Sequence, residues 1–141
     1  MTDLSLEREF DIPAEQLFDW ISSKGKVLQW FGPEGMKVAE SALDFSQTGP
    51  WYAVMSNDTM RVKVSGHVTH VDPPRSVGLT WGWHDEDGAR GAESHVTLTV
   101  VPTKIGARLL LDHRDLDDSE QSARHEQGWI STFNKMATII E

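Results

Sequence analysis

The chain has 141 residues, which suits one domain with its own core, and we expect a single domain over 1–141. Its 22 acidic residues outnumber its 13 basic ones, and the net charge is −9. Because the chain has no cluster of Lys and Arg, this charge argues against nucleic acid or an anionic lipid surface as a partner. Cysteine is absent, which excludes disulfides, thiolate zinc sites and a cysteine nucleophile.

No apolar run approaches the roughly 20 residues that span a bilayer. The acidic first residues also lack the basic and apolar regions of a signal peptide. We therefore expect no membrane insertion and a cytoplasmic location.

The first third of the chain predicts one strand and two short helices. Residues 4–10 form the expected strand, and Pro13 favours the first turn of the helix that follows. The apolar stripe of this helix consists of Leu17, Phe18, Trp20 and Ile21. A second helical turn is expected over 27–31, and the Gly and Pro residues of 32–35 predict a loop.

In the middle of the chain, apolar and polar residues alternate, which is typical of antiparallel strands with one buried and one exposed face. We expect strands over 36–44, 51–55, 60–71, 77–84, 95–100 and 107–114. The inward face should carry Trp51, Ala53, Val64, Trp81, Trp83 and His113, with other apolar residues of the same parity.

The last segment predicts a long helix. Asp118 could cap this helix together with Gln121, and the apolar stripe consists of Trp129, Phe133, Met136, Ala137 and Ile140. Gly128, inside the helix, indicates either a close approach to the sheet or a ligand, or a packing contact without a ligand. Strands that run between helices predict an α+β domain in which an antiparallel sheet packs on this helix.

Several segments, in their order and spacing, resemble the START-like (SRPBCC) superfamily. The branch is similar to the C-terminal domain of the Aha-type activators of the Hsp90 ATPase. The resemblance covers nearly the whole chain and rests on residues 10–18, 30–35, 49–51, 66–68, 72–75, Trp81, 109–113 and 128–129.

The resemblance implies a helix-grip fold, in which a curved antiparallel sheet of about six to seven strands wraps around the long C-terminal helix. Two short helices lie between the first two strands. Members of the superfamily bind lipids, sterols, polyketides or other apolar molecules in the enclosed cavity, and some are cyclases or dehydratases. This chain departs from the family pattern at Gly49-Pro50, where a Gly-Gly pair is usual.

Aromatic residues dominate the expected inward faces, which favours a pocket for a small molecule. The opposing interpretation is that the same rings only fill the core. The candidate ligand-binding residues are Trp30, Phe31, Trp51, Ala53, Val64, Trp81, Trp83, His113, Trp129 and Phe133.

His113 is the histidine that clearly alternates with the apolar residues on the inward face of its strand. It is therefore the one weak candidate for a proton shuttle. A core histidine bonded to a carbonyl or near Trp129 is the alternative. We assign no other catalytic residue. The chain shows no metal-ligand spacing, phosphate loop or dinucleotide fingerprint, so we expect no metal and no cofactor.

The leading hypothesis is a non-catalytic protein that binds a small apolar molecule of lipid, sterol or polyketide type. One alternative is an enzyme of the cyclase or dehydratase kind, acting through His113. Another is a chaperone-associated or regulatory interaction module in a stress response. The full-length activators have a separate N-terminal domain without a counterpart in this sequence, which weakens the chaperone hypothesis. A homodimer is left open.

Overall fold

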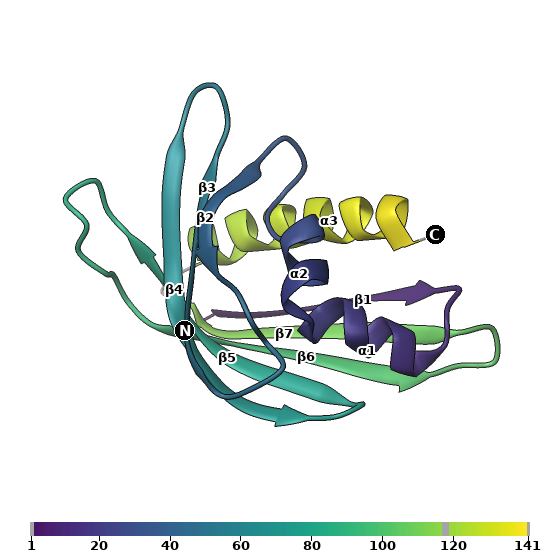
Figure 1. The fold of residues 1–141 in the computed structure, drawn as a ribbon. Helices are drawn as coiled ribbons and strands as arrows, with labels where there is room; N and C mark the ends of the chain where they lie inside the picture. The colour runs from purple at the N-terminus through teal and green to yellow at the C-terminus, as the bar shows by residue number, and fades with distance from the viewer. Residues whose placement is uncertain (1, 117–118, 141) are drawn as a thin grey trace.

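The computed structural model describes residues 2–116 and 119–140 and contains seven strands and three helices (Figure 1). In chain order these are β1 (Thr2–Phe10), α1 (Ala14–Ser22), α2 (Lys24–Trp30), β2 (Lys37–Ala42), β3 (Gly49–Ser56), β4 (Arg61–Asp72), β5 (Ser76–His84), β6 (Ser94–Pro102), β7 (Ala107–Leu116) and α3 (Ser119–Ile140). None of the described helices has the length and apolar character needed to cross a membrane.

The strands form one antiparallel sheet in the order β1-β7-β6-β5-β4-β3-β2. Strands β2 to β7 follow one another as neighbours, and β1 pairs with the last strand. The helices α1 and α2 therefore connect the two edges of the sheet (Figure 1). The expected α+β helix-grip fold, with two short helices between the first two strands, is confirmed.

The period of two explains why these strands form a half-buried sheet. In β6 and β7, burial alternates along the chain, and the inward set includes Val96, Leu98, Leu109, Leu111 and His113. The apolar stripe of α3 covers this face, with Trp129, Phe133 and Met136 buried. Asp118, which was expected to cap α3 with Gln121, lies outside the described residues.

The strand expected over 36–44 is shorter than predicted, because β2 ends at Ala42. Beyond its end, Leu43 and Phe45 are buried in the core. The N–H of Phe45 donates to the carbonyl of Ser22 at 3.1 Å, so this segment is attached to α1 and leaves the ladder.

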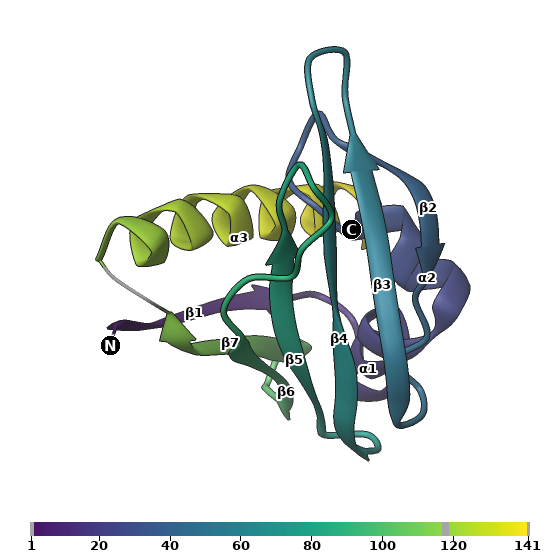
Figure 2. The same cartoon turned by 90° about the vertical axis from the view of Figure 1, so that its left-hand side faces the viewer.

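Helix α3 packs mainly against β1 and also contacts α2 and β7. Figure 2 shows α3 crossing the concave side of the sheet, with the ends of β4 and β5 in front of it. Because the sheet curves away from the helix toward β3 and β4, the backbone of α3 comes close to the sheet only on the side of β1 and β7.

Candidate functional site

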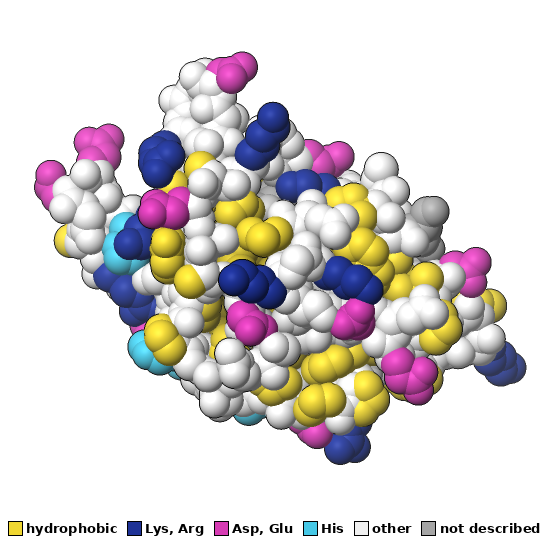
Figure 3. Space-filling view, viewed as in Figure 1, with side chains coloured by type: hydrophobic (Ala, Val, Ile, Leu, Met, Phe, Trp, Pro, Cys, Tyr) yellow, Lys and Arg dark blue, Asp and Glu magenta, His cyan; other side chains and the backbone are white. Residues whose placement is uncertain are grey.

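A pocket of about 490 Å³ lies between the first half of α3 and the ends of β3, β4 and β5. This volume is within the range of small-molecule sites. Figure 3 shows hydrophobic side chains reaching one face of the molecule beside Lys and Arg side chains. The wall consists of Phe31, Gly32, Pro33, Met36, Met55, Met60, Val62, Trp81, Trp83, His84, Arg124, His125, Gly128, Trp129 and Thr132.

Trp81 lies at the centre of the aromatic part of this wall. Its ring centroid is 5.4 Å from that of Trp129 and 5.6 Å from that of Trp83. Phe31, also in the wall, is stacked on Trp81 at 5.8 Å, and Trp51 lies behind the wall at 5.5 Å from Trp81. Rings in contact at these distances and at tilted angles form a rigid surface.

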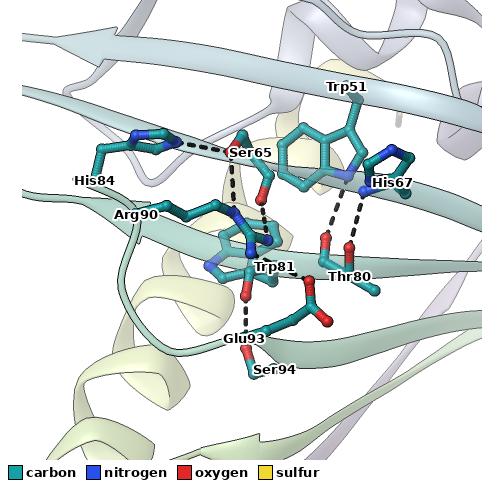
Figure 4. A network of polar contacts seen from close by, with 9 residues as sticks. All are labelled: Trp51, Ser65, His67, Thr80, Trp81, His84, Arg90, Glu93 and Ser94. Carbon is teal, nitrogen blue, oxygen red and sulfur yellow. Dashed lines mark hydrogen bonds and ion pairs between the residues drawn. The ribbon is translucent and has the colours of Figure 1, made fainter. Parts of the chain in front are cut away.

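Trp51 pairs with Gly66 of β4, and at Gly66 the strands β4 and β5 approach each other closely. A Cβ atom at Gly66 would overlap the carbonyl oxygen of Thr80, so this position requires glycine. That carbonyl accepts the indole N–H of Trp51 at 3.2 Å, and the Thr80 hydroxyl accepts the backbone N–H of His67 at 2.8 Å (Figure 4). Two hydrogen bonds that involve side chains thus join the strands at this close approach.

On the outer face of the sheet, Arg90 supports the end of β5 that carries the pocket tryptophans (Figure 4). Its guanidinium lies over Gly82, donates to the carbonyl of Ser65 at 2.9 Å and pairs with Glu93 at 3.1 Å. The hydroxyl of Ser65 also bonds Nε2 of His84 at 2.7 Å. These contacts attach the β5–β6 loop to β4.

The loop after α2 closes one end of the pocket. The N–H of Glu34 donates to the hydroxyl of Ser131 at 2.9 Å, and that hydroxyl donates to the Glu34 carboxylate at 3.2 Å. Lys135 donates to the carbonyl of Met36 at 3.4 Å. Burial lowers the pKa of the Lys135 ammonium group, although the nearby Glu34 acts in the opposite direction. The loop is therefore attached to α3 at two points.

At four tryptophans in and around the pocket, the indole N–H donates a hydrogen bond to an acceptor of the protein. Trp81 is the exception: its Nε1 is buried and has no partner among the described residues, although Trp81 lines the pocket. An unmade hydrogen bond of this kind costs about 1–3 kcal/mol. The four bonds are Trp30 to the Trp20 carbonyl at 2.7 Å, Trp51 to the Thr80 carbonyl at 3.2 Å, Trp83 to His125 Nε2 at 2.9 Å and Trp129 to His113 Nδ1 at 3.1 Å.

His113 is fully buried, and protein groups engage both of its ring nitrogens. Because Nδ1 accepts the N–H of Trp129, the neutral ring carries its proton on Nε2 and donates it to the Ser94 hydroxyl at 2.7 Å. That hydroxyl donates in turn to the Trp81 carbonyl at 3.3 Å. Burial lowers the pKa of the imidazole to about 3, and charge on His125 and His95 acts in the same direction.

Gly128 faces open space in the pocket. A Cβ atom at this position would meet no atom within 4 Å, although Gly128 is part of the wall. Gly128 therefore makes no close approach to the sheet, and the interpretation of a packing contact without a ligand is wrong. Its carbonyl accepts the hydroxyl proton of Thr132 at 2.8 Å, one turn further along α3.

Four of the ten residues singled out from the sequence line the pocket: Phe31, Trp81, Trp83 and Trp129. The other six lie in the core behind it, all at most 4% exposed. These are Trp30, Trp51, Ala53, Val64, His113 and Phe133.

The sequence did not indicate the methionines or Arg124 as wall residues. Met55 and Val62 share the inward parity of their strands, so parity could have indicated them. Arg124, Gly128 and Thr132 are four residues apart, which places them on one helix face. Met60, directly before β4, has the same parity as Val62, so parity could have indicated it as well.

No group of three or more His, Asp or Glu side chains that could hold a metal ion occurs among the described residues. The polar part of the wall instead consists of His84, Arg124, His125 and Thr132. Because these are single polar groups around an apolar surface, the arrangement suits orientation of a ligand better than coordination of an ion.

Comparison with known families agrees with this architecture. Residues 11–141 match the family described as Activator of Hsp90 ATPase homolog 1-like protein. The chain belongs to this family. The family is part of the START-like superfamily, so the resemblance seen in the sequence is confirmed.

Solved structures of similar proteins have the same fold. The AHSA1 protein from Silicibacter pomeroyi is 57% identical, with a TM-score of 0.94 over 97% of this chain and 96% of that one. A protein from Chromobacterium violaceum is 16% identical, with a TM-score of 0.84 over 100% and 99% of the two chains. One from Mycobacterium smegmatis is 18% identical, with a TM-score of 0.80 over 99% and 90%. A comparison with curated proteins found no match.

Proposed function

We propose that this protein binds a small, mostly apolar molecule in the pocket between α3 and the ends of β3, β4 and β5. The observation that carries the proposal is the open space of about 490 Å³ next to Gly128, within a wall of aromatic and methionine side chains. Filling it would remove apolar surface from water on both the ligand and the wall, at about 25 cal/mol per Å².

The wall combines rigid and adaptable parts. The rings of Trp81, Trp83 and Trp129 are held by neighbouring rings or by hydrogen bonds. Three of the five methionines of the chain, at positions 36, 55 and 60, also line the pocket. Methionine side chains are flexible and polarisable, so this part can adjust to ligands of different shape.

An enzymatic function has less support from the site. A cyclase or dehydratase requires a general acid or base within reach of the substrate. His113 lies behind the wall and uses both nitrogens within the protein. His84, which is in the wall, bonds Ser65 through Nε2 and the carbonyl of Gly88 through Nδ1. A binding protein is therefore the function that these residues support best.

The test uses N-phenyl-1-naphthylamine, a neutral dye whose fluorescence rises in apolar sites. We expect saturable binding to the wild-type protein with one site per chain. Gly128→Leu places a side chain in the pocket without loss of helix propensity, because leucine is a strong helix former. This variant should bind the dye at least about tenfold more weakly, a loss of ~1.4 kcal/mol.

Gly25→Leu is the matched control, since Gly25 lies in α2, is exposed and does not line the pocket. It should leave dye binding unchanged. Equal affinity of the Gly128→Leu and wild-type proteins would refute the proposal, because the dye would then occupy another surface.

A further inference from the structure

One methionine of the pocket wall is much more exposed than the others. The wall contains three methionines, at positions 36, 55 and 60. Met60 is 50% exposed, whereas Met36 is 9% exposed and Met55 is 2% exposed. Met136, the remaining described methionine, is fully buried in the core. Met60 therefore belongs both to the wall and to the molecular surface, which places it at the opening of the pocket.

The sulfur atoms of the two buried wall methionines are also engaged by the protein. The side-chain amide of Asn57 donates to Sδ of Met36 at 3.1 Å. Sδ of Met55 is packed against Gly32, where a Cβ atom would lie only 2.6 Å from it. Because water hardly reaches these two residues, an oxidant dissolved in water would meet the sulfur of Met60 first.

The backbone of Met60 is fixed, so its side chain stays at the pocket. Its N–H donates to Oδ1 of Asn57 at 2.9 Å, and its carbonyl accepts the N–H of Asn57 at 2.9 Å. Through its amide, the same Asn57 is bonded to Met36, in the loop that closes one end of the pocket. A chemical change at the sulfur of Met60 therefore takes place in the wall itself.

A hydroperoxide oxidises a thioether without any other reactant. The sulfur donates a lone pair to one peroxide oxygen, and the O–O bond breaks. The second oxygen leaves and takes the proton of the first, as water or an alcohol. The sulfur thereby loses two electrons and becomes a sulfoxide, while the peroxide gains two. A flexible apolar side chain becomes a polar one with an acceptor oxygen, and methionine sulfoxide reductases reverse the change.

We infer that Met60 is an oxidation site through which a hydroperoxide lowers the affinity of this pocket for its ligand. This inference rests on the proposed function and concerns the regulation of the same site. The sulfoxide oxygen of Met60 would bind water at the opening of the pocket. A mostly apolar ligand that covers Met60 has to remove this water, and a polar group that loses its water without a new hydrogen bond opposes binding.

The first part of the test locates the oxidation. The folded wild-type protein is treated briefly with hydrogen peroxide, and peptide mapping by mass spectrometry gives the rate of sulfoxide formation at each methionine. We expect Met60 to be oxidised at least about tenfold faster than Met36 and Met55, because burial protects their sulfur atoms. An equal rate at Met36 or Met55 would overturn the inference.

The second part measures binding of N-phenyl-1-naphthylamine after removal of the peroxide. Oxidation should weaken binding to the wild type about fivefold, a loss of ~1 kcal/mol. Methionine sulfoxide reductases should restore the original affinity. Met60→Leu is the matched control, because it retains every other methionine, and its affinity should be the same before and after treatment. An equal loss in Met60→Leu, or no loss in the wild type after complete oxidation of Met60, would overturn the inference.

The two proposals fail in different ways. If the dye does not bind, or if Gly128→Leu does not affect its binding, the proposed function is wrong. If the dye binds in the pocket and complete oxidation of Met60 leaves its affinity unchanged, only the inference about oxidation is wrong.

Discussion

Replacement of Gly128 by alanine tests directly whether the pocket exists beside α3. Glycine inside a helix costs about 1 kcal/mol relative to alanine. At most positions that face a sheet, an added methyl group would offset this gain by steric overlap. Here the methyl group would meet no atom within 4 Å, so the full gain should remain.

The expected size follows from the length of the chain. For 141 residues, the entropy of unfolding is about 0.3 kcal/mol per kelvin, so a gain of ~1 kcal/mol raises Tm by about 3 °C. Far-ultraviolet circular dichroism during heating measures this shift in the protein without ligand. Because a methyl group takes little of the pocket, dye binding should weaken far less than in Gly128→Leu.

Gly25→Ala provides the comparison, since its added methyl group also meets no atom within 4 Å but lies in α2, outside the pocket. It should change Tm in the same direction and leave dye binding unaffected. A fall in Tm for Gly128→Ala would refute the reasoning, because it would mean that the backbone of α3 is packed against other atoms at this position.

Three further predictions concern the groups behind the pocket. His113 resists protonation when folded (pKa about 3, against 6.5 for an unperturbed histidine), so stability that is present above pH 6.5 should be lost as the pH falls toward 3. Between about pH 6.5 and pH 5, this effect should lower the free energy of unfolding of the wild type by ~2 kcal/mol, measured by urea unfolding. The effect should be absent in His113→Gln. An equal dependence of the two free energies on pH would contradict the low pKa of His113. Gly66→Ala should lower the free energy of unfolding by at least about 2 kcal/mol, because its Cβ overlaps the Thr80 carbonyl, and a urea midpoint unchanged from wild type would argue against the close approach. Trp30→Phe leaves the carbonyl of Trp20 without its donor and should cost about 1–3 kcal/mol in guanidinium unfolding, whereas a neutral result would mean that water replaces the bond.

The fold could be predicted from the sequence because its signals are local. Alternation of apolar and polar residues in β6 and β7 depends only on which way successive side chains point. The stripe of α3 depends likewise on the helical period, and the segments that indicated the family are short and contiguous. These patterns were sufficient to predict the antiparallel sheet, the long helix and their packing.

The candidate site could be predicted only in part. Parity placed Trp51, Trp81 and Trp83 on the concave face, but it contains no information about the distance between that face and α3. Trp51 lies in the filled core behind the pocket, whereas Trp81 and Trp83 line the pocket. The same limit explains why His113 was left between two interpretations, since its hydrogen bonds to Ser94 and Trp129 join three separate elements.

The sequence by itself therefore determined the elements, their inward faces and the family, because each depends on residues close together along the chain. Only the tertiary structure decided where the pocket lies and which side chains line it. The close approach of β4 and β5 at Gly66, the loop held by Ser131 and the position of α3 on β1 and β7 together shape the pocket. Such a shape is a property of packing between distant segments, and no local pattern of residues encodes it.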